Sequence, residues 1–174
     1  RAAAQTMRFG SHYFYGDPSS STYSAQAEIT SMQLNMNIAR EGYVTKPSNP
    51  GFFQRGMTGS HYDSGTLKGG TSDFNTGSHY NTSTGIFTAP VTGRYLVSCG
   101  VLVESGTGRL EGQISKNNST NLANFNGTGT TYDGPSATIV VQLSANDNIR
   151  VKRTSGNAYN SGHGNHYFCA YLLG

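Results

Sequence analysis

One strand near the middle of the chain constrains the rest of the fold, because it is apolar on both sides. It follows a turn signal at Thr92 and Gly93, and its alternate residues form two rows that are both largely apolar. The first row is Tyr95, Val97, Cys99, Val101 and Val103, and the second is Leu96, Ser98, Gly100 and Leu102. A strand with one face in water alternates apolar with strongly polar residues. We therefore expect one face to meet a second sheet and the other to meet something outside the subunit.

Short strands recur along most of the chain, and no segment shows helical periodicity. Polar turns and prolines separate them, as at 81–85 and at Pro90, which cannot donate to a ladder. The predicted strands are 52–53, a short one at Phe74, 86–88, 95–103, 110–115, 137–143, 149–153 and 167–173, with loops at 59–79, 117–131 and 155–164. Short strands at this spacing predict an all-β fold, a two-sheet sandwich of jelly-roll type.

Three motifs in the expected order resemble the C1q/TNF-like family. They are Tyr-Asn at 80–81 with Thr-Gly-Ile-Phe-Thr-Ala-Pro at 84–90 and Gly-x-Tyr-x-Val at 93–97, the turn Leu-Ser-Ala-Asn-Asp-Asn-Ile-Arg-Val at 143–151, and the terminal strand Phe-Cys-Ala-Tyr-Leu-Leu at 168–173. The family has "YN, TG-x-F-x-AP, G-x-Y-x-F", then "L-x-x-GD-x-V-x-V", then "FSGFLL". The resemblance implies a jelly-roll head over residues 51–174.

Three positions depart from the family pattern. Val97 stands where the family has an aromatic residue, and Ala170 stands where it has the glycine of the last strand. Asn146 replaces the glycine of the turn. Asparagine tolerates the left-handed backbone conformation that glycine adopts, so we expect Asn146 to adopt it.

Residues 1–50 have a different character from the head. Met32, Leu34, Met36 and Ile38 alternate with polar or small residues, but one such row cannot bury a core alone. Three copies around an axis, or another protein, could cover it. We expect an extended β arm or shaft, joined to the head by the proline-rich segment 47–51.

The end of this arm carries a second resemblance. Residues 32–47, which finish in Glu-Gly-Tyr-Val-Thr-Lys-Pro, are similar to a stretch of the form "RMRID-x-x-GYVTKP" that often precedes C1q-like heads in phage virion proteins. The resemblance implies a position on a bacteriophage particle.

The family topology implies that the long strand and the last strand lie side by side, with one sheet face buried between three subunits. A contiguous apolar patch of this kind marks an interface, and a closed ring uses the same patch pair on every subunit. The predicted trimer interface is Leu96, Ser98, Gly100, Leu102, His166, Phe168, Ala170 and Leu172. The predicted core is Phe87, Tyr95, Val97, Cys99, Val101, Cys169 and Tyr171.

The two cysteines lie on these neighbouring strands. We expect Cys99 and Cys169 both to point into the sandwich, where a disulfide is conceivable. Free buried thiols are the favoured interpretation, because a virion protein folds in a reducing cytoplasm.

Histidines and acids offer few candidate sites. Gly-Ser-His-Tyr occurs at 10–13, 59–62 and 77–80, with a near copy at 164–167. It suggests either a surface of amphipathic rings or simple recurrence in a biased composition, and His163 and His166 are the weak metal candidates. Glu104 and Glu111 could form a carboxylate pair, but we expect Arg109 to form a surface ion pair with Glu104.

Composition narrows the function classes. The net charge is +3 without any Lys/Arg run, which disfavours nucleic-acid binding. No apolar run reaches the length of a membrane span, no signal-peptide pattern is present, and no catalytic or cofactor motif is found. We expect a non-enzymatic protein without cofactors.

The resemblances together favour a homotrimeric surface head on a phage virion. The preferred hypothesis is the tip of a tail fibre or spike that binds a host surface glycan or protein, with the arm joined to other virion proteins. A capsid decoration trimer whose arm grips capsid proteins is the close alternative. A secreted C1q-like recognition module is the alternative of another class, disfavoured by the absence of a collagen repeat.

Overall fold

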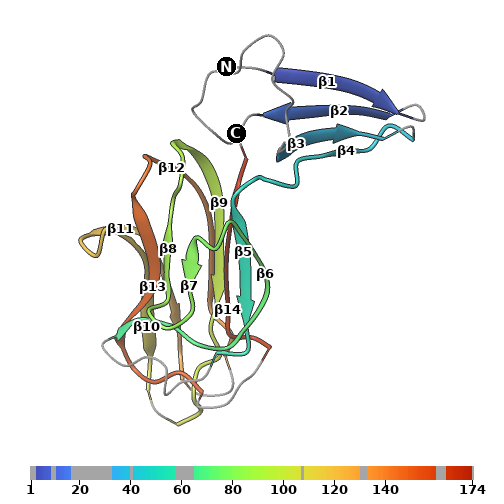
Figure 1. Cartoon of the computed structure of the whole chain (residues 1–174). Coiled ribbons are helices and arrows are strands. Elements are labelled where there is room, and N and C mark those ends of the chain that lie inside the picture. The colour runs from blue at the N-terminus through green and yellow to red at the C-terminus, as the bar shows by residue number, and fades with distance from the viewer. Residues whose placement is uncertain are drawn as a thin grey trace. The chain divides into compact units, whose positions relative to one another are not determined.

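The computed structural model describes residues 3–8, 11–16, 33–39, 41–57, 65–106, 108–129, 133–159 and 164–173 (Figure 1). The chain divides into two compact units, Arg1–Asn49 and Pro50–Gly174. The first unit contains one four-stranded antiparallel sheet in the order β1-β2-β3-β4. Its strands are β1 (Ala3–Arg8), β2 (Ser11–Gly16), β3 (Gln33–Ile38) and β4 (Val44–Thr45).

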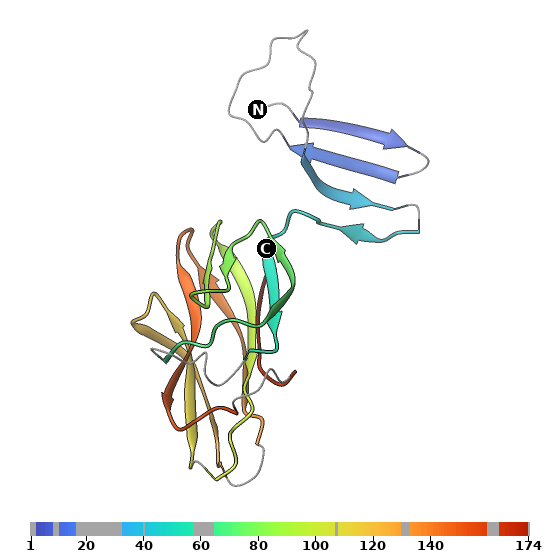
Figure 2. The same ribbon diagram turned by 60° about the horizontal axis from the view of Figure 1, so that its bottom comes forward.

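The second unit is a sandwich of two antiparallel five-stranded sheets (Figures 1 and 2). The first sheet has the order β12-β9-β14-β5-β6, and its strands are β5 (Gly51–Arg55), β6 (Thr71–Thr76), β9 (Gly93–Gly100), β12 (Ser136–Leu143) and β14 (Tyr167–Leu172). The second has the order β11-β10-β13-β8-β7, and its strands are β7 (Tyr80–Asn81), β8 (Ile86–Thr88), β10 (Leu110–Lys116), β11 (Thr120–Gly127) and β13 (Asn148–Ser155). The all-β jelly-roll prediction is confirmed.

The core between the sheets is built around stacked aromatic rings. Phe52 lies parallel to Tyr80, with ring centroids 4.2 Å apart, and meets Phe168 edge-on at 5.0 Å. Phe87 lies 5.2 Å from Phe52 and 5.8 Å from Tyr95. Four of these five residues have no exposed surface and Tyr80 has 3%. Rings from both sheets therefore hold the layers together, because each buried aromatic removes a large apolar area from water.

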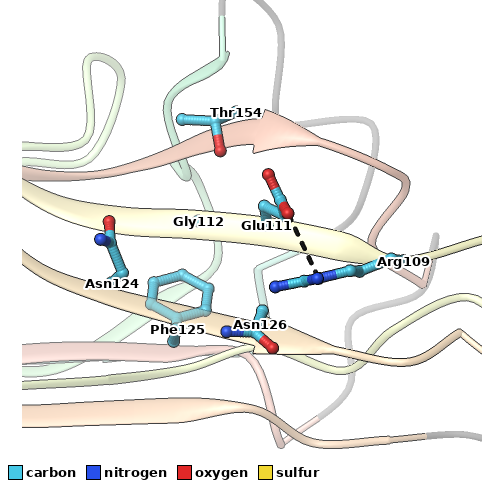
Figure 3. Close-up of a pocket in the computed structure, with 7 residues that line it drawn as sticks. All are labelled: Arg109, Glu111, Gly112, Asn124, Phe125, Asn126 and Thr154. Atoms are coloured by element: carbon cyan, nitrogen blue, oxygen red, sulfur yellow. Dashed lines mark ion pairs between the residues drawn. The ribbon is translucent and has the colours of Figure 1, made fainter.

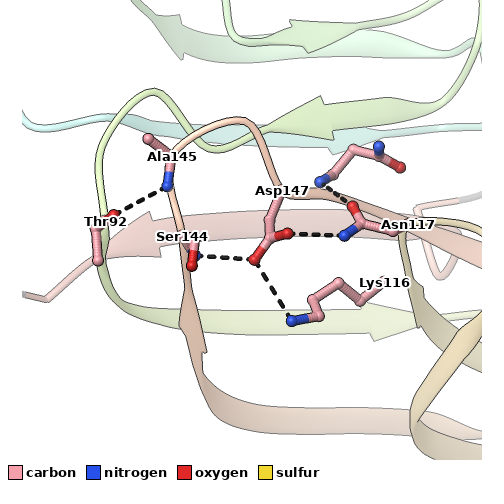
Figure 4. Close-up of polar contacts among 7 residues, drawn as sticks. Thr92, Lys116, Asn117, Ser144, Ala145 and Asp147 are labelled. Atoms are coloured by element: carbon pink, nitrogen blue, oxygen red, sulfur yellow. Dashed lines mark hydrogen bonds and ion pairs between the residues drawn. The ribbon is translucent and has the colours of Figure 1, made fainter.

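A single carboxylate ties together the turns at the end of the sandwich where β9 begins (Figure 4). Asp147 accepts hydrogen bonds from the Ser144 amide at 2.9 Å and from Asn117 Nδ2 at 2.7 Å. It also forms an ion pair with Lys116 Nζ at 3.4 Å. The hydrogen bond from Asn117, more than any other contact, lowers the pKa of Asp147. The neighbouring Asn146 has a φ of 72°, which confirms the left-handed conformation expected there.

Two strand boundaries differ from the sequence expectations. The strand predicted for 95–103 ends at Gly100, and Val103 lies beyond it in an isolated bridge to Ala158. The segment 117–131, predicted as loop, contains strand β11. This strand is rich in asparagine, a poor strand former, and β10 holds it at the edge of its sheet by ladder hydrogen bonds. Within the described residues, no helix is long and apolar enough to cross a membrane.

Candidate interaction surface

The first sheet of the sandwich presents an apolar face to solvent. We call this the outer face, the side of β12-β9-β14-β5-β6 that points away from the core. Cross-strand pairing places Val140 beside Leu96 and Leu96 beside Tyr171 in one row. Their exposed fractions are 58%, 38% and 41%. Side chains paired in this way stand on the same face, so the three form one continuous apolar strip.

A second row of the outer face combines aromatic and small residues. Phe74 pairs with Phe53, and Phe53 pairs with Cys169. The row continues from Cys169 to Ser98 and from Ser98 to Thr138. The hydroxyl oxygens of Ser98 and Thr138 lie 2.7 Å apart and form a hydrogen bond. Because these hydroxyls satisfy one another, they add little polarity to the face.

Two glycines leave room for tyrosine rings on this face. A methyl group at Gly51 would overlap the Tyr171 ring, and one at Gly100 would overlap the Tyr167 ring. Tyr167 also stacks on Phe53, with centroids 6.2 Å apart and planes 16° from parallel. The glycines therefore allow the tyrosine rings to lie across neighbouring strands.

One ion pair marks the edge of the outer face. The Arg55 guanidinium Nε donates to both carboxylate oxygens of Asp73 at 2.9 Å, and both side chains remain about half exposed. The polar pair joins β5 to the edge strand β6. Polar groups at the rim and apolar groups at the centre are the usual pattern of a protein interface.

The faces predicted for the last strand are reversed in the structure. Phe168 pairs with Cys99 and Ala170 pairs with Val97, so both point into the core instead of the predicted interface. Cys169 and Tyr171, predicted to be core, stand on the outer face. A one-residue difference in register moves every side chain of a strand to its other face. The strand is apolar on both sides, so its sequence does not indicate which alternation is correct.

The other residues predicted for the interface divide between the two sides. Leu96, Ser98 and Gly100 lie on the outer face of β9. Leu102 lies beyond the end of that strand and is 5% exposed. His166 precedes β14 and is fully buried, and Leu172 pairs with Tyr95 and packs against the core. The remaining predicted core residues, Phe87, Tyr95, Val97, Cys99 and Val101, have no exposed surface.

The two cysteines are free thiols on opposite sides of the same sheet. The expectation that both point inward is wrong, because Cys169 pairs with Ser98 while Cys99 pairs with Phe168. Burial raises the pKa of Cys99 to about 12 and also raises the pKa of Cys169. Neither thiol therefore forms a thiolate readily near neutral pH.

The histidine motif is structural where it is described. At 77–80, Gly77 and Ser78 have positive φ values of 75° and 58° and make the turn between β6 and β7, while Tyr80 enters the core. The copy at 59–62 and the metal candidate His163 lie outside the described residues, and the copy at 10–13 is described only in part. Among the residues that are described, no group of three His, Cys, Asp or Glu side chains could hold a metal ion.

The acidic candidates also have a plain structural explanation. Arg109 forms its ion pair with Glu111, at 3.2 Å, instead of with Glu104 as expected. Arg109 directly precedes β10, and alternate residues of an extended chain share a face, so Arg109 lies beside Glu111.

The outer face includes residues that the sequence did not single out. Val140, Phe53 and Phe74 belong to this face, although only the strands that contain them were predicted. In the run 137–143 the polar Thr138 and Gln142 share the more exposed row with Val140, but we did not use this alternation to assign a face. The pairing of Val140 with Leu96 is what fixes the face.

A comparison with models of protein families identifies the family to which the head belongs. The model of the C1q domain matches residues 52–173. The chain belongs to the C1q domain family. This confirms the C1q/TNF-like resemblance, which covered residues 51–174. Among curated proteins, none matches the chain significantly.

Solved structures show the same jelly-roll fold at low sequence identity. The globular domain of zebrafish complement 1qA protein has a TM-score of 0.56 and 16% identity, and the match covers 72% of this chain and 98% of that one. Eiger TNF from S. frugiperda has a TM-score of 0.56 and 14% identity, covering 73% and 94%. Murine APRIL at pH 5.0 has a TM-score of 0.57 and 16% identity, covering 72% and 99%.

C1q and TNF domains are typically non-enzymatic recognition modules, and they commonly form homotrimers. An apolar sheet face on a C1q domain is therefore a candidate assembly surface.

Proposed function

We propose that this protein is a homotrimeric recognition head whose subunits associate through the outer face. The observation that carries the proposal is the apolar strip of Val140, Leu96 and Tyr171 on three neighbouring strands. A strip of this kind on a water-soluble sheet is costly unless another apolar surface covers it. A second and third copy of the chain supply that surface in a closed ring, because every subunit carries the same outer face.

The test replaces one outer-face residue by a charged one and compares it with a matched control. Leu96→Glu places a charge in the middle of the strip, where association would bury it without a partner. Val91→Glu changes a residue that is 45% exposed but lies in the turn before β9, outside the outer face. Sedimentation velocity should show a trimer for the native chain and Val91→Glu, and a folded monomer for Leu96→Glu. A native chain that stays monomeric, or a Leu96→Glu variant that stays trimeric, would contradict the proposal.

We propose that the protein is located on the surface of a bacteriophage virion. The similarity of residues 32–47 to the stretch that often precedes C1q-like heads in phage virion proteins supports it. The preferred version is the tip of a tail fibre or spike that binds a host surface glycan or protein, where three identical weak sites add avidity. The close alternative is a capsid decoration trimer whose arm grips capsid proteins.

Imaging of phage particles distinguishes the fibre-tip location from the capsid location. Antibodies against residues 51–174, located by electron microscopy on intact phage particles, should label fibre tips if the preferred version holds. Labelling of the capsid surface would favour the decoration trimer. Failure to label any particle would contradict the virion location and favour a secreted C1q-like recognition module. The trimer test does not depend on this result.

A further inference from the structure

A small polar pocket lies on the second sheet of the sandwich (Figure 3). The outer face belongs to the first sheet. The pocket has a volume of about 200 Å³. Three neighbouring strands line it near the end of the sandwich where β10 begins and β13 ends. The lining residues are Arg109, Glu111, Gly112, Asn124, Phe125, Asn126 and Thr154.

The floor of the pocket is the cross-strand pair of Gly112 and Phe125. Phe125 is 4% exposed and packs in the core, so the floor is rigid. A methyl group at Gly112 would overlap the Phe125 ring, which makes glycine the residue that fits there. Apart from Arg109, which directly precedes β10, the lining residues therefore belong to strands of the packed sheet.

Two asparagine amides form one wall. Asn124 and Asn126 are two residues apart on β11, so both point to the solvent side of this edge strand. Asn124 Oδ1 accepts a hydrogen bond from Asn121 Nδ2 at 2.6 Å, which orients the amide and leaves its own Nδ2 to donate. Asn126 makes no side-chain hydrogen bond to any residue that the structure describes. Both amides can therefore bind a ligand that accepts and donates hydrogen bonds.

A neutralised ion pair forms another part of the rim. Arg109 Nε lies 3.2 Å from Glu111 Oε1, and the two side chains are 60% and 46% exposed. The pair offers a second carboxylate oxygen as acceptor and further guanidinium N–H groups as donors, without net charge. Thr154 adds a hydroxyl from β13.

From these features we propose that the pocket binds one residue of a neutral saccharide. Sugar hydroxyls both donate and accept, as the amides, carboxylate, guanidinium and hydroxyl of the lining require. The volume is below the roughly 300–1,000 Å³ of pockets for larger ligands, which suits a single ring. A phosphorylated ligand fits poorly because Arg109, the cation of the lining, is already paired with Glu111. An apolar peptide side chain fits poorly because polar groups dominate the walls.

The position of the pocket is also suitable for contact with a target. Residue 50 enters the head where β5 begins, and the pocket lies near the other end of the sandwich. That this end faces outward in an assembled particle rests on the proposed function. The pocket itself is complete within one subunit and lies on the sheet that the proposed trimer leaves uncovered.

Saturation-transfer NMR on the full chain tests the site. The probes are glucose, galactose, mannose, rhamnose and N-acetylglucosamine, each added separately. At least one should receive saturation with a saturable concentration dependence. Asn126→Ala should weaken that binding roughly tenfold, the effect of losing one or two hydrogen bonds, and Asn124→Asp should also weaken it. Thr120→Ala changes an exposed residue of the same strand outside the pocket and should leave binding unchanged.

Two results would overturn the site: no saturation transfer to any of the five sugars, or binding that survives both asparagine changes. Circular dichroism on each variant checks that the fold is intact, and the second variant keeps the test valid if one does not fold. Sedimentation of the same samples separates this outcome from the trimer proposal. Sugar binding by a monomer would support the pocket while contradicting the trimer, and a trimer without sugar binding would do the reverse.

Discussion

Alanine replacement of Phe168 and of Tyr171 measures directly which way the last strand faces. The two residues lie three positions apart on β14 and are both aromatic, but they stand on opposite sides of the sheet. Phe168 has no exposed surface and packs 5.0 Å from the ring of Phe52 and 5.9 Å from that of Tyr80. Tyr171 is 41% exposed on a single subunit.

The expected magnitudes differ severalfold. Truncating a buried phenylalanine removes its transfer free energy and leaves a cavity, so Phe168→Ala should lower the free energy of unfolding by about 3–5 kcal/mol. Tyr171→Ala should cost about 1 kcal/mol or less in an isolated subunit, because the ring has less packing to lose. Its effect should grow with protein concentration, because the proposed trimer would stabilise the folded state by mass action.

Urea unfolding followed by circular dichroism supplies the measurement, at two protein concentrations for each variant. The native chain and the two variants are compared by their unfolding midpoints and slopes. A larger loss for Tyr171→Ala than for Phe168→Ala at low concentration would refute the assigned register of β14, and with it the composition of the outer face.

Three further predictions concern single residues of the head. The native chain should have a higher free energy of unfolding than Asp147→Asn at neutral pH, where the lowered pKa keeps the Asp147 carboxylate charged. This difference should disappear as the pH falls below about 3.8, the usual pKa of aspartate, and urea titrations across that range measure it. Gly112→Ala should destabilise the head by about 1–3 kcal/mol, since the new methyl must displace Phe125 or the strand, and an unchanged melting temperature would contradict that packing. In Cys169→Ser, the remaining thiol of Cys99 should react with iodoacetamide only after unfolding, and rapid native labelling would show that it is not buried.

Sequence patterns indicated the architecture because turns and strand periods are local signals. The glycine and asparagine turns, Pro90, and the alternation of polar with apolar residues placed most strands of the sandwich near their observed positions. Asn146 illustrates how far such reasoning extends, since its left-handed conformation follows from the chemistry of one side chain. Strand β11 was missed because its stability comes from pairing with β10, which no local pattern shows.

The candidate surface was harder to predict, because faces depend on register. β14 is apolar at nearly every position, and only its pairing with β9 shows that Phe168 points inward and Cys169 outward. The saccharide pocket could not be predicted for a related reason. Its residues come from three strands, and Asn124 and Asn126 lie in a segment that resembled a loop.

Native mass spectrometry of the full chain tests the central claim most directly. The proposed association through the outer face predicts that the chain appears as a complex of three copies at micromolar concentration. Leu96→Glu should appear as single copies with a compact, low charge state. A native chain observed as compact single copies throughout that concentration range would contradict assembly through the outer face.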